Sequence, residues 1–224
     1  MKLYFSPLAC SLATRIACYE AGADVTYVEV DPKTKKTEDG RDFRSIHALG
    51  LVPALEIEDG EIVTENAAIL QLVAERYPES RLAPTDALGR ARLQQWLCFI
   101  GTELHKSLYA PLLDANAPAE VKAYALGKSE SRLRWLEQRL EGREHLLDGF
   151  SVADAYLYTV LNWSLATPVP LEPWPAIRAY HDRLRRRPSI ARAFGEERER
   201  YLRHLARHER PAPGGGAPAV ERRS

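Results

Sequence analysis

The stretch GLVPALEIEDGEIVTENAAILQL, residues 50–72, decides the fold that we predict for this chain. Two short apolar runs flank Asp59-Gly60, and a glycine at such a place, tolerating positive φ, is typical of a hairpin turn. From Glu65-Asn66 onward, apolar residues return every three to four positions, and Pro78 follows shortly after the run, as in a helix. The stretch therefore predicts an antiparallel pair of strands followed by a helix.

Both ends of this stretch have features of a ligand site. A helix start collects unpaired N–H groups and the positive end of a dipole, so Glu65-Asn66 lie where an anionic group could be bound. Pro53 donates no ladder hydrogen bond, and a cis Val52-Pro53 bond would leave the Val52 backbone free to pair with an extended ligand. An ordinary trans proline at a strand start is the alternative.

The residues before this stretch predict a strand, a helix and a second strand. KLYF (2–5) and VTYVEV (25–30) have strand composition, residues 12–17 place apolar side chains on one helical face, and Gly22 ends that helix. This order implies a parallel pair with a crossover helix. We therefore expect residues 1–78 to form an α/β domain, βαβ then ββα, with a mixed four-stranded sheet.

The composition changes beyond Pro78. Residues 79–86 are rich in proline and small polar residues and predict a linker. Residues 87–203 show apolar side chains at helical spacing and no strand pattern, which predicts an all-helical second domain. Residues 204–224 have too few apolar side chains to offset the entropy of ordering them, so we predict a disordered tail.

Charge and composition limit the possible partners. Lys plus Arg and Asp plus Glu are equal at 31 each, which gives no indication of a nucleic-acid or anionic-membrane partner. No signal peptide or long apolar run is recognisable, so we expect a cytoplasmic protein without a membrane segment. Three scattered cysteines without metal-ligand spacing suit a reducing compartment and predict neither a disulfide nor a metal site.

Cys10 is the first candidate for chemistry. It lies between a turn and the first turn of a helix, where N–H groups and the dipole favour a thiolate and lower the thiol pKa. The alternative is a small buried apolar residue. Position 13 is Ala13, so a CxxC dithiol cycle is excluded, whereas a mixed disulfide with an external thiol is not. Cys18 and Cys98 are expected to be structural.

Other polar residues allow two interpretations each. Lys35, followed by a second lysine, could reach a carboxylate or be merely solvated. His105 could donate a hydrogen bond or act near neutral pH, or could simply pack within its helix. Ser151 and Asp154 fit a capping box, with a structural contribution of about 1 kcal/mol or more.

With these pieces in place, the chain resembles the cytosolic glutathione S-transferases, most of all the bacterial Beta class. The resemblance covers nearly all of residues 1–203 and is carried by KLYFSPLACSL, DPKTKKTEDGRDF, VPALEIEDG, TENAAILQ, ELHK and SVADAYLY. It implies a thioredoxin-like first domain, an all-helical second domain and a homodimer with two sites near the subunit interface. Glutathione is the implied co-substrate.

The resemblance also implies the roles of individual residues. Cys10 corresponds to a cysteine beside the glutathione sulfur, and His105 to a histidine near that thiol. Lys35 corresponds to the lysine that meets the glycine carboxylate. Val52 corresponds to the residue whose backbone pairs with the cysteinyl part, and Pro53 to the family's cis-proline.

The γ-glutamyl end and the long helix complete the implied site. Glu65 and Asn66 correspond to the pair that holds this end, with a carboxylate for its ammonium group and helix-start N–H groups for its carboxylate. The residues of the long helix that are implied to lie close to glutathione are Cys98, Thr102, Glu103, Leu104 and His105. Because Cys98 stands where the class often has an asparagine, one contact to the ligand is in question.

The expected function is conjugation of the glutathione thiolate to small electrophiles, with thiol-disulfide exchange through Cys10 as a second activity. A non-catalytic binding or regulatory protein on the same fold is the alternative, and a monothiol glutaredoxin-like reductase is a weaker one. The sequence does not identify the electrophile. Apolar side chains of the helical domain that could contact it, or could equally belong to the core, are Tyr109, Leu112, Leu113 and Trp163.

Overall fold

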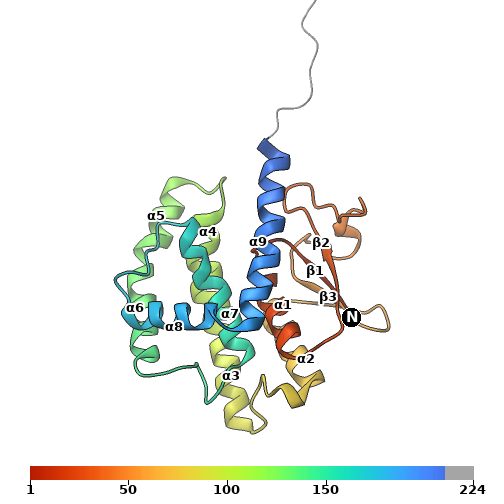
Figure 1. Cartoon of the computed structure of the whole chain (residues 1–224). Helices are drawn as coiled ribbons and strands as arrows, with labels where there is room; N and C mark the ends of the chain where they lie inside the picture. The colour runs from red at the N-terminus through yellow and green to blue at the C-terminus, as the bar shows by residue number, and fades with distance from the viewer. Residues whose placement is uncertain (210–224) are drawn as a thin grey trace, which may run out of the picture.

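The computed structural model describes residues 1–209, with side chains described through residue 206. A sheet domain and a helical domain lie side by side, and the long helix α9 (Pro188–Glu209) runs between them (Figure 1). The predicted fold class, a thioredoxin-like α/β domain followed by an all-helical domain, is confirmed.

The sheet has four strands in the order β2-β1-β3-β4. The strands are β1 (Lys2–Phe5), β2 (Thr26–Glu29), β3 (Ala54–Glu56) and β4 (Ile62–Thr64). β1 pairs parallel with β2, and β3 pairs antiparallel with both β1 and β4. Gly60 in the β3–β4 turn has φ +79°, the left-handed conformation that an Asp-Gly pair predicts.

The two faces of the sheet carry different parts of the core. Leu3 and Phe5 of β1 are fully buried with the helices, whereas Tyr4 faces the other side, where it packs with Val30 and Phe43. This alternation follows from the strand period of two. The helical elements of this domain are α1 (Ser11–Glu20), η1 (Phe43–Ser45), α2 (Asn66–Arg76) and η2 (Pro78–Ser80).

Helix α1 joins the two domains. Its residues Ser11–Cys18 are all buried, and it packs against α2 of its own domain and against α7 and α9 of the helical domain. A helix that is buried all round needs partners on several sides. The start of α1, where Cys10 lies, is consequently fixed by both domains.

The helical domain differs in detail from the predicted pattern. Its elements besides α9 are α3 (Ala87–Phe99), η3 (Ile100–Tyr109), α4 (Ala110–Leu113), α5 (Ala119–Gly127), α6 (Ser129–Leu140), α7 (Val152–Leu161), η4 (Asn162–Ala166) and α8 (Pro175–Arg185). The first three form one continuous run whose middle, η3, is wound as a π-helix. Such widened turns frequently occur at functional sites. α5 and α6 follow one another closely and are separated at Lys128.

Helix α9 extends further than predicted. The sequence places the start of a tail at residue 204, but residues 204–209 are helical. His204 is buried, and its Nδ1 lies 4.0 Å from the Asp31 carboxylate in the segment after β2. The helix therefore continues because its far end packs against the sheet domain. The rest of the predicted tail lies outside the described residues, and the domain limits near 78 and 86 stay predictions.

The predicted capping box at the start of α7 is present, and its carboxylate does more than cap the helix. Asp154 is fully buried and accepts hydrogen bonds from the Ser151 N–H and hydroxyl, both at 2.8 Å. It also accepts from the Leu146 N–H at 2.9 Å and from the Tyr180 hydroxyl at 2.7 Å. Asp154 thus joins α7, α8 and the segment between α6 and α7.

We expect Asp154→Ala to lower the free energy of unfolding by about 2 kcal/mol, because it leaves several buried donors without an acceptor. Asp154→Asn, which keeps one carbonyl acceptor, should lower it less. Urea-induced unfolding followed by circular dichroism measures both. Equal losses in the two variants would mean that the hydrogen bonds to the carboxylate do not account for the effect.

Two further expectations concern membranes and cysteines. Among residues 1–209, no helix is long and apolar enough to cross a membrane. All three cysteines are free thiols, and Cys18 is buried as a structural residue should be. Cys98 is exposed, so the expectation that it is structural was wrong. It lies on the outer face of α3, where helical periodicity alone does not distinguish buried from exposed positions.

Candidate functional site

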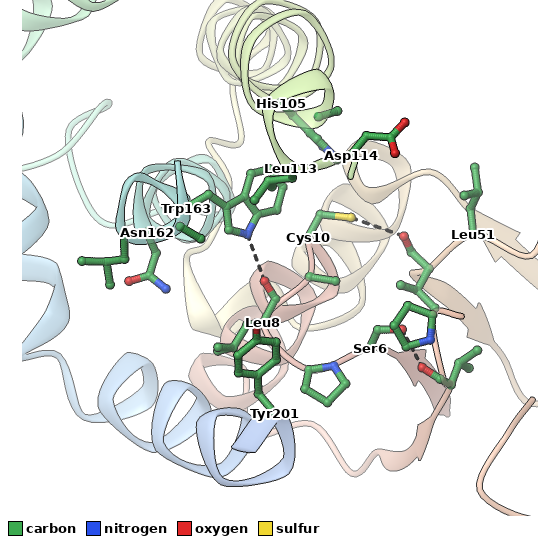
Figure 2. Close-up of a pocket in the computed structure, with 18 of the residues that line it drawn as sticks. Ser6, Leu8, Cys10, Leu51, His105, Leu113, Asp114, Asn162, Trp163 and Tyr201 are labelled. Atoms are coloured by element: carbon green, nitrogen blue, oxygen red, sulfur yellow. Dashed lines mark hydrogen bonds between the residues drawn. The ribbon is translucent and has the colours of Figure 1, made fainter. Parts of the chain in front are cut away.

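A pocket of about 740 Å³ lies between the sheet domain and the helical domain (Figure 2). Cys10, Lys35 and Val52 line it from the sheet domain. His105 and Trp163 line it from the helical domain. The two domains therefore form one cavity, to which both contribute polar groups and apolar side chains.

Cys10 lies at the base of the pocket, directly before α1. Its side chain is 9% exposed, and its Sγ–H donates to the Val52 carbonyl oxygen at 3.3 Å. Burial raises the pKa of the Cys10 thiol to about 11, although Lys106 and the N–H groups of Cys10 and Ser11 act in the opposite direction. The lowered pKa expected from the helix start was therefore wrong, because desolvation outweighs the helix end.

The segment before Cys10 is held by the helical domain. Leu8 has φ +60°, a conformation that side-chain-bearing residues rarely adopt. Its N–H donates to the Glu197 carboxylate at 2.8 Å, and its carbonyl oxygen accepts from the Trp163 indole N–H at 2.9 Å (Figure 2). Contacts from α9 and η4 thus hold the main chain in place two residues before Cys10.

Val52 presents its backbone to the pocket. The Val52-Pro53 peptide bond is cis, so the trans alternative is excluded, and Pro53 is buried beneath. The Val52 N–H donates to no group in the part of the chain that the structure describes. A polar group of this kind at the wall of a pocket is available to an extended ligand.

Asn66 and Glu65 lie at the start of α2. The Asn66 side chain is buried, donates to the Cys10 carbonyl oxygen at 3.2 Å and accepts from the Thr14 hydroxyl at 2.9 Å. Glu65 is exposed, with φ +65°, and its charge is close enough to raise the pKa of Cys10. The Asn66 side chain thus joins the starts of α1 and α2, leaving the helix-start N–H groups and the Glu65 carboxylate for a ligand.

His105 is neutral at physiological pH. Burial and the neighbouring Lys106 lower the pKa of His105 to about 4, so the expectation that it titrates near neutral pH was wrong. Its Nδ1 lies 2.8 Å from the Tyr156 hydroxyl, and its ring packs edge-on against Trp163. His105 can therefore orient a ligand by hydrogen bonding without a change of charge.

Lys35 and Lys106 are the two lysines at the pocket. Lys35 follows β2 and has φ +59°, with its backbone fixed by hydrogen bonds to Asp31 and Phe43. Lys106, adjacent to His105 on η3, is exposed and lowers the pKa of Cys10. Neither side chain has an ion-pair partner among the described residues.

Seven of the predicted site residues do not line this pocket. Pro53, Glu65 and Asn66 are close to Val52 or Cys10, whereas the other four lie on α3 and η3. Leu104 is fully buried in the core, so its side chain does not reach a ligand. The Thr102 hydroxyl donates to the Cys98 carbonyl oxygen at 3.0 Å, and Glu103 pairs with Arg132 at 2.7 Å. Cys98, Thr102 and Glu103 do not line the pocket of this chain. Successive residues of a helix face different sides of it. The resemblance to the family does not indicate which of these residues face the pocket.

Some pocket residues were missed from the sequence. Asn162 comes from η4, and no local motif indicates its role. Tyr156 of α7 does not line the pocket but contacts His105, and no local motif indicates that contact either. Arg198 and Tyr201 belong to α9, whose charged composition was not recognised as the wall of a pocket. The position of Lys106, directly after His105 on the same helix, could have indicated that it lies at the pocket. Of the four apolar candidates, Leu113 and Trp163 line the pocket, whereas Tyr109 is fully buried.

No group of three or more potential metal ligands occurs within the described residues. The site consists of a thiol, a free backbone edge, a helix start and lysines. A thiol, a free backbone edge and lysines in a pocket between a thioredoxin-like domain and a helical domain are typical of proteins that bind a thiol ligand.

Comparison with known proteins identifies the family. Residues 9–76 match the family model "Glutathione S-transferase, N-terminal domain", and residues 95–188 match "Glutathione S-transferase, C-terminal domain". Glutathione S-transferase GstA of Escherichia coli O157:H7 is 39% identical over 88% of this chain and 98% of its own length. The chain therefore belongs to the glutathione S-transferase family, whose members are transferases that use glutathione as co-substrate.

Solved structures agree with this assignment. A sphingomonad glutathione S-transferase complexed with glutathione is 42% identical, with a TM-score of 0.84, over 88% of this chain and 98% of its own. A bacterial beta-class enzyme from Sphingomonas chungbukensis is 41% identical, with the same TM-score and coverage. The resemblance to the Beta class that the sequence motifs indicated is thus confirmed.

Proposed function

We propose that this protein conjugates the glutathione thiolate to small electrophiles and, as a second activity, exchanges disulfides with glutathione through Cys10. The observation that carries the proposal is the pocket in which Cys10, the Val52 backbone and Lys35 face an apolar wall of the helical domain. The groups on the sheet-domain side match a tripeptide, and the wall opposite suits an apolar second substrate.

Glutathione fits these groups in one direction. Its γ-glutamyl end lies at Glu65 and the start of α2, where a carboxylate meets the ammonium group and N–H groups meet the carboxylate. Its cysteinyl part pairs with the Val52 backbone, as strand addition does. Its glycine carboxylate meets Lys35. The glutathione sulfur then lies beside Cys10.

The groups around Cys10 stabilise a glutathione thiolate. The N–H groups of Cys10 and Ser11 face this position, Lys106 adds a positive charge, and neutral His105 can donate a hydrogen bond. In conjugation the thiolate sulfur forms a bond to an electrophilic carbon, the bond to the leaving group breaks, and the leaving group departs with the electron pair. The thiol proton passes to solvent.

Cys10→Ala should abolish the mixed disulfide that forms at position 10 with glutathione, whereas conjugation should persist in part. Because the exposed Cys98 thiol can form an adduct of its own, proteolytic peptides are used to locate the adduct. In the wild type, the Cys10 thiolate attacks oxidised glutathione, forms the mixed disulfide and releases one glutathione thiolate. Because burial raises the pKa of Cys10 to about 11, this adduct should form faster as pH rises.

Intact-protein mass spectrometry after incubation with oxidised glutathione detects the adduct. Cys18→Ala and Cys98→Ala are the matched controls, and both should retain it. An adduct of equal yield in Cys10→Ala would contradict the assignment.

We also propose a homodimer in the cytoplasm. Exposed apolar side chains of the loop before Val52 and of α3 support an interface, since Leu49 is 70%, Leu51 46% and Leu88 62% exposed. Contacts from Cys98, Thr102 or Glu103 to glutathione would then come across that interface. Sedimentation velocity gives the oligomeric state.

The conjugation activity is tested with reduced glutathione and a chlorodinitrobenzene. Turnover above the uncatalysed rate supports the proposal. Binding of glutathione without turnover of any electrophile would favour the alternative, a binding or regulatory protein on this fold.

A further inference from the structure

One side of the pocket is formed by the last part of helix α9. Phe194, Arg198, Tyr201 and Leu202 all line the pocket, and their spacing places them on one face of this helix. We refer to residues 198–206 as the distal α9 segment. Figure 2 shows Tyr201 reaching from α9 towards Leu8, at the segment that leads to Cys10.

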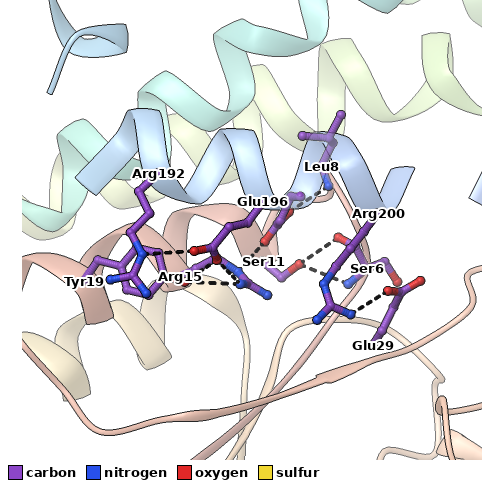
Figure 3. Close-up of polar contacts among 10 residues, drawn as sticks. Ser6, Leu8, Ser11, Arg15, Tyr19, Glu29, Arg192, Glu196 and Arg200 are labelled. Carbon is purple, nitrogen blue, oxygen red and sulfur yellow. Dashed lines mark hydrogen bonds and ion pairs between the residues drawn. The ribbon is translucent and has the colours of Figure 1, made fainter. Parts of the chain in front are cut away.

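An ion pair and a histidine–carboxylate contact fix the distal α9 segment against the sheet domain. Arg200 lies 3.0 Å from the Glu29 carboxylate at the end of β2, as Figure 3 shows, and His204 lies 4.0 Å from that of Asp31. Glu29 and Asp31 flank Val30, which lines the pocket. Tyr201 and Leu202 are therefore held at the pocket by contacts on both sides of them in the sequence.

The helical domain brings several exposed apolar side chains to the pocket. Leu165 is 76% exposed, Leu202 48%, Leu113 42% and Tyr201 39%, and all four line the same pocket. Trp163 lines it as well, so the helical domain offers apolar surface around the cavity. Exposed apolar side chains gathered around a cavity indicate a ligand with a large apolar surface.

The charged side chains at the pocket are unbalanced. The described residues bring Lys35, Lys106 and Arg198 to it, against one acid, Asp114. Lys35 and Lys106 are assigned to glutathione and its thiolate. Arg198 is exposed, lies one helical turn before Tyr201 and has no ion-pair partner in the part of the chain described. Asp114 lies on the opposite side of the pocket from Tyr201 (Figure 2).

We propose that the second substrate is an aromatic electrophile bearing an anionic group, with its ring against Tyr201 and Leu202 and its anion at Arg198. This inference rests on the proposed transferase function and makes the distal α9 segment a determinant of specificity. A guanidinium group binds a carboxylate through paired N–H donors, and an aromatic ring stacks on tyrosine.

A matched pair of substrates tests the proposal. Chloronitrobenzoate carries a carboxylate, and its amide, chloronitrobenzamide, is neutral and of similar size. With either one, the glutathione sulfur bonds to the ring carbon that bears chlorine, the C–Cl bond breaks, and chloride leaves with the electron pair. The ratio of kcat/KM for the carboxylate to that for the amide isolates the charge preference.

Arg198→Gln should lower this ratio by roughly fivefold to tenfold, as expected for loss of a charge-assisted contact at a partly exposed site. Arg186→Gln is the matched control, since Arg186 is also exposed but lies away from the pocket, and it should leave the ratio unchanged. Tyr201→Ala should lower kcat/KM for both electrophiles by about tenfold through loss of apolar contact.

Isothermal titration calorimetry with reduced glutathione separates a failure of the anion assignment at Arg198 from a failure of the proposed transferase function. If glutathione binds the wild type and Arg198→Gln equally and the ratio falls, the inference is supported. If glutathione binds but Arg198→Gln leaves the ratio at its wild-type value, the anion assignment is overturned. If the wild type binds no glutathione, the failure lies with the proposed function itself.

Discussion

Replacing Arg15 by methionine is expected to lower the free energy of unfolding by about 3–5 kcal/mol, because it leaves a buried carboxylate without its partner. Arg15 in α1 is 2% exposed, and its Nε lies 2.9 Å from the fully buried Glu197 carboxylate in α9. The guanidinium is held between the rings of Phe5 and Tyr27, 4.2 and 4.0 Å from their centroids. Methionine fills the space but supplies no charge.

The same contact supports the site. The second oxygen of Glu197 accepts from the Leu8 N–H, so loss of Arg15 also disturbs the segment before Cys10. Figure 3 shows this arrangement, with Arg15 and Leu8 on either side of the α9 carboxylates. The pair thus links the stability of the domain interface to the geometry of the pocket.

The loss of unfolding free energy in Arg15→Met should depend on pH. Burial raises the pKa of Glu197 from 4.5 to about 7, even with Arg15 beside it. The folded state then holds a proton that the unfolded state has lost, so stability falls as pH rises from the unfolded towards the folded pKa. Without Arg15 the folded pKa is higher still and the fall continues further. The loss in Arg15→Met should therefore be larger at about pH 8 than at about pH 5.

Urea unfolding of the wild type and Arg15→Met at the two pH values measures this difference in stability. Arg192→Met is the matched control, since Arg192 also pairs with an α9 glutamate, Glu196, but is exposed, and it should leave stability nearly unchanged. A loss in Arg15→Met no greater than in the control would contradict the importance of the buried pair.

The elements that the sequence predicted best are those with local signals. The Asp59-Gly60 turn, the helix opening at Glu65-Asn66 and the strand at 2–5 depend on residues close together in the chain, and all three are present. Cys10 directly precedes α1, Val52 lies just before β3, and Lys35 lies in the segment after β2, and all three meet in one pocket.

The features that the sequence did not predict depend on distant contacts. Arg15 and Glu197 are separated by 182 positions, and nothing local marks either as buried. The pKa of Cys10 was expected to be lowered by the helix start, but both domains cover the thiol and burial decides the direction. Likewise, α9 continues past residue 203 because the sheet domain contacts its far end.

Glu65→Ala is expected to weaken binding of reduced glutathione by at least about 100-fold, or about 2.7 kcal/mol, because it leaves the γ-glutamyl ammonium group without its carboxylate. Glu65 lies at the start of α2, near enough to Cys10 to raise its pKa, and its side chain has no ion-pair partner among the described residues. Removal of the Glu65 side chain should therefore weaken the binding of glutathione without disturbing the fold.

Glu61→Ala is the matched control. Glu61 is an exposed glutamate at the turn before β4, and it does not line the pocket. This variant removes the same charge four residues earlier in the chain and should bind glutathione as the wild type does. A weakening equal to that of Glu65→Ala would mean that overall charge, and not the position of Glu65, determines the affinity.

Isothermal titration calorimetry of reduced glutathione into the wild type, Glu65→Ala and Glu61→Ala tests the central claim, that the pocket at Cys10 binds glutathione. We predict one site per subunit in the wild type and in Glu61→Ala, with binding lost or greatly weakened in Glu65→Ala. Absence of binding to the folded wild-type protein, or unchanged binding in Glu65→Ala, would contradict that claim.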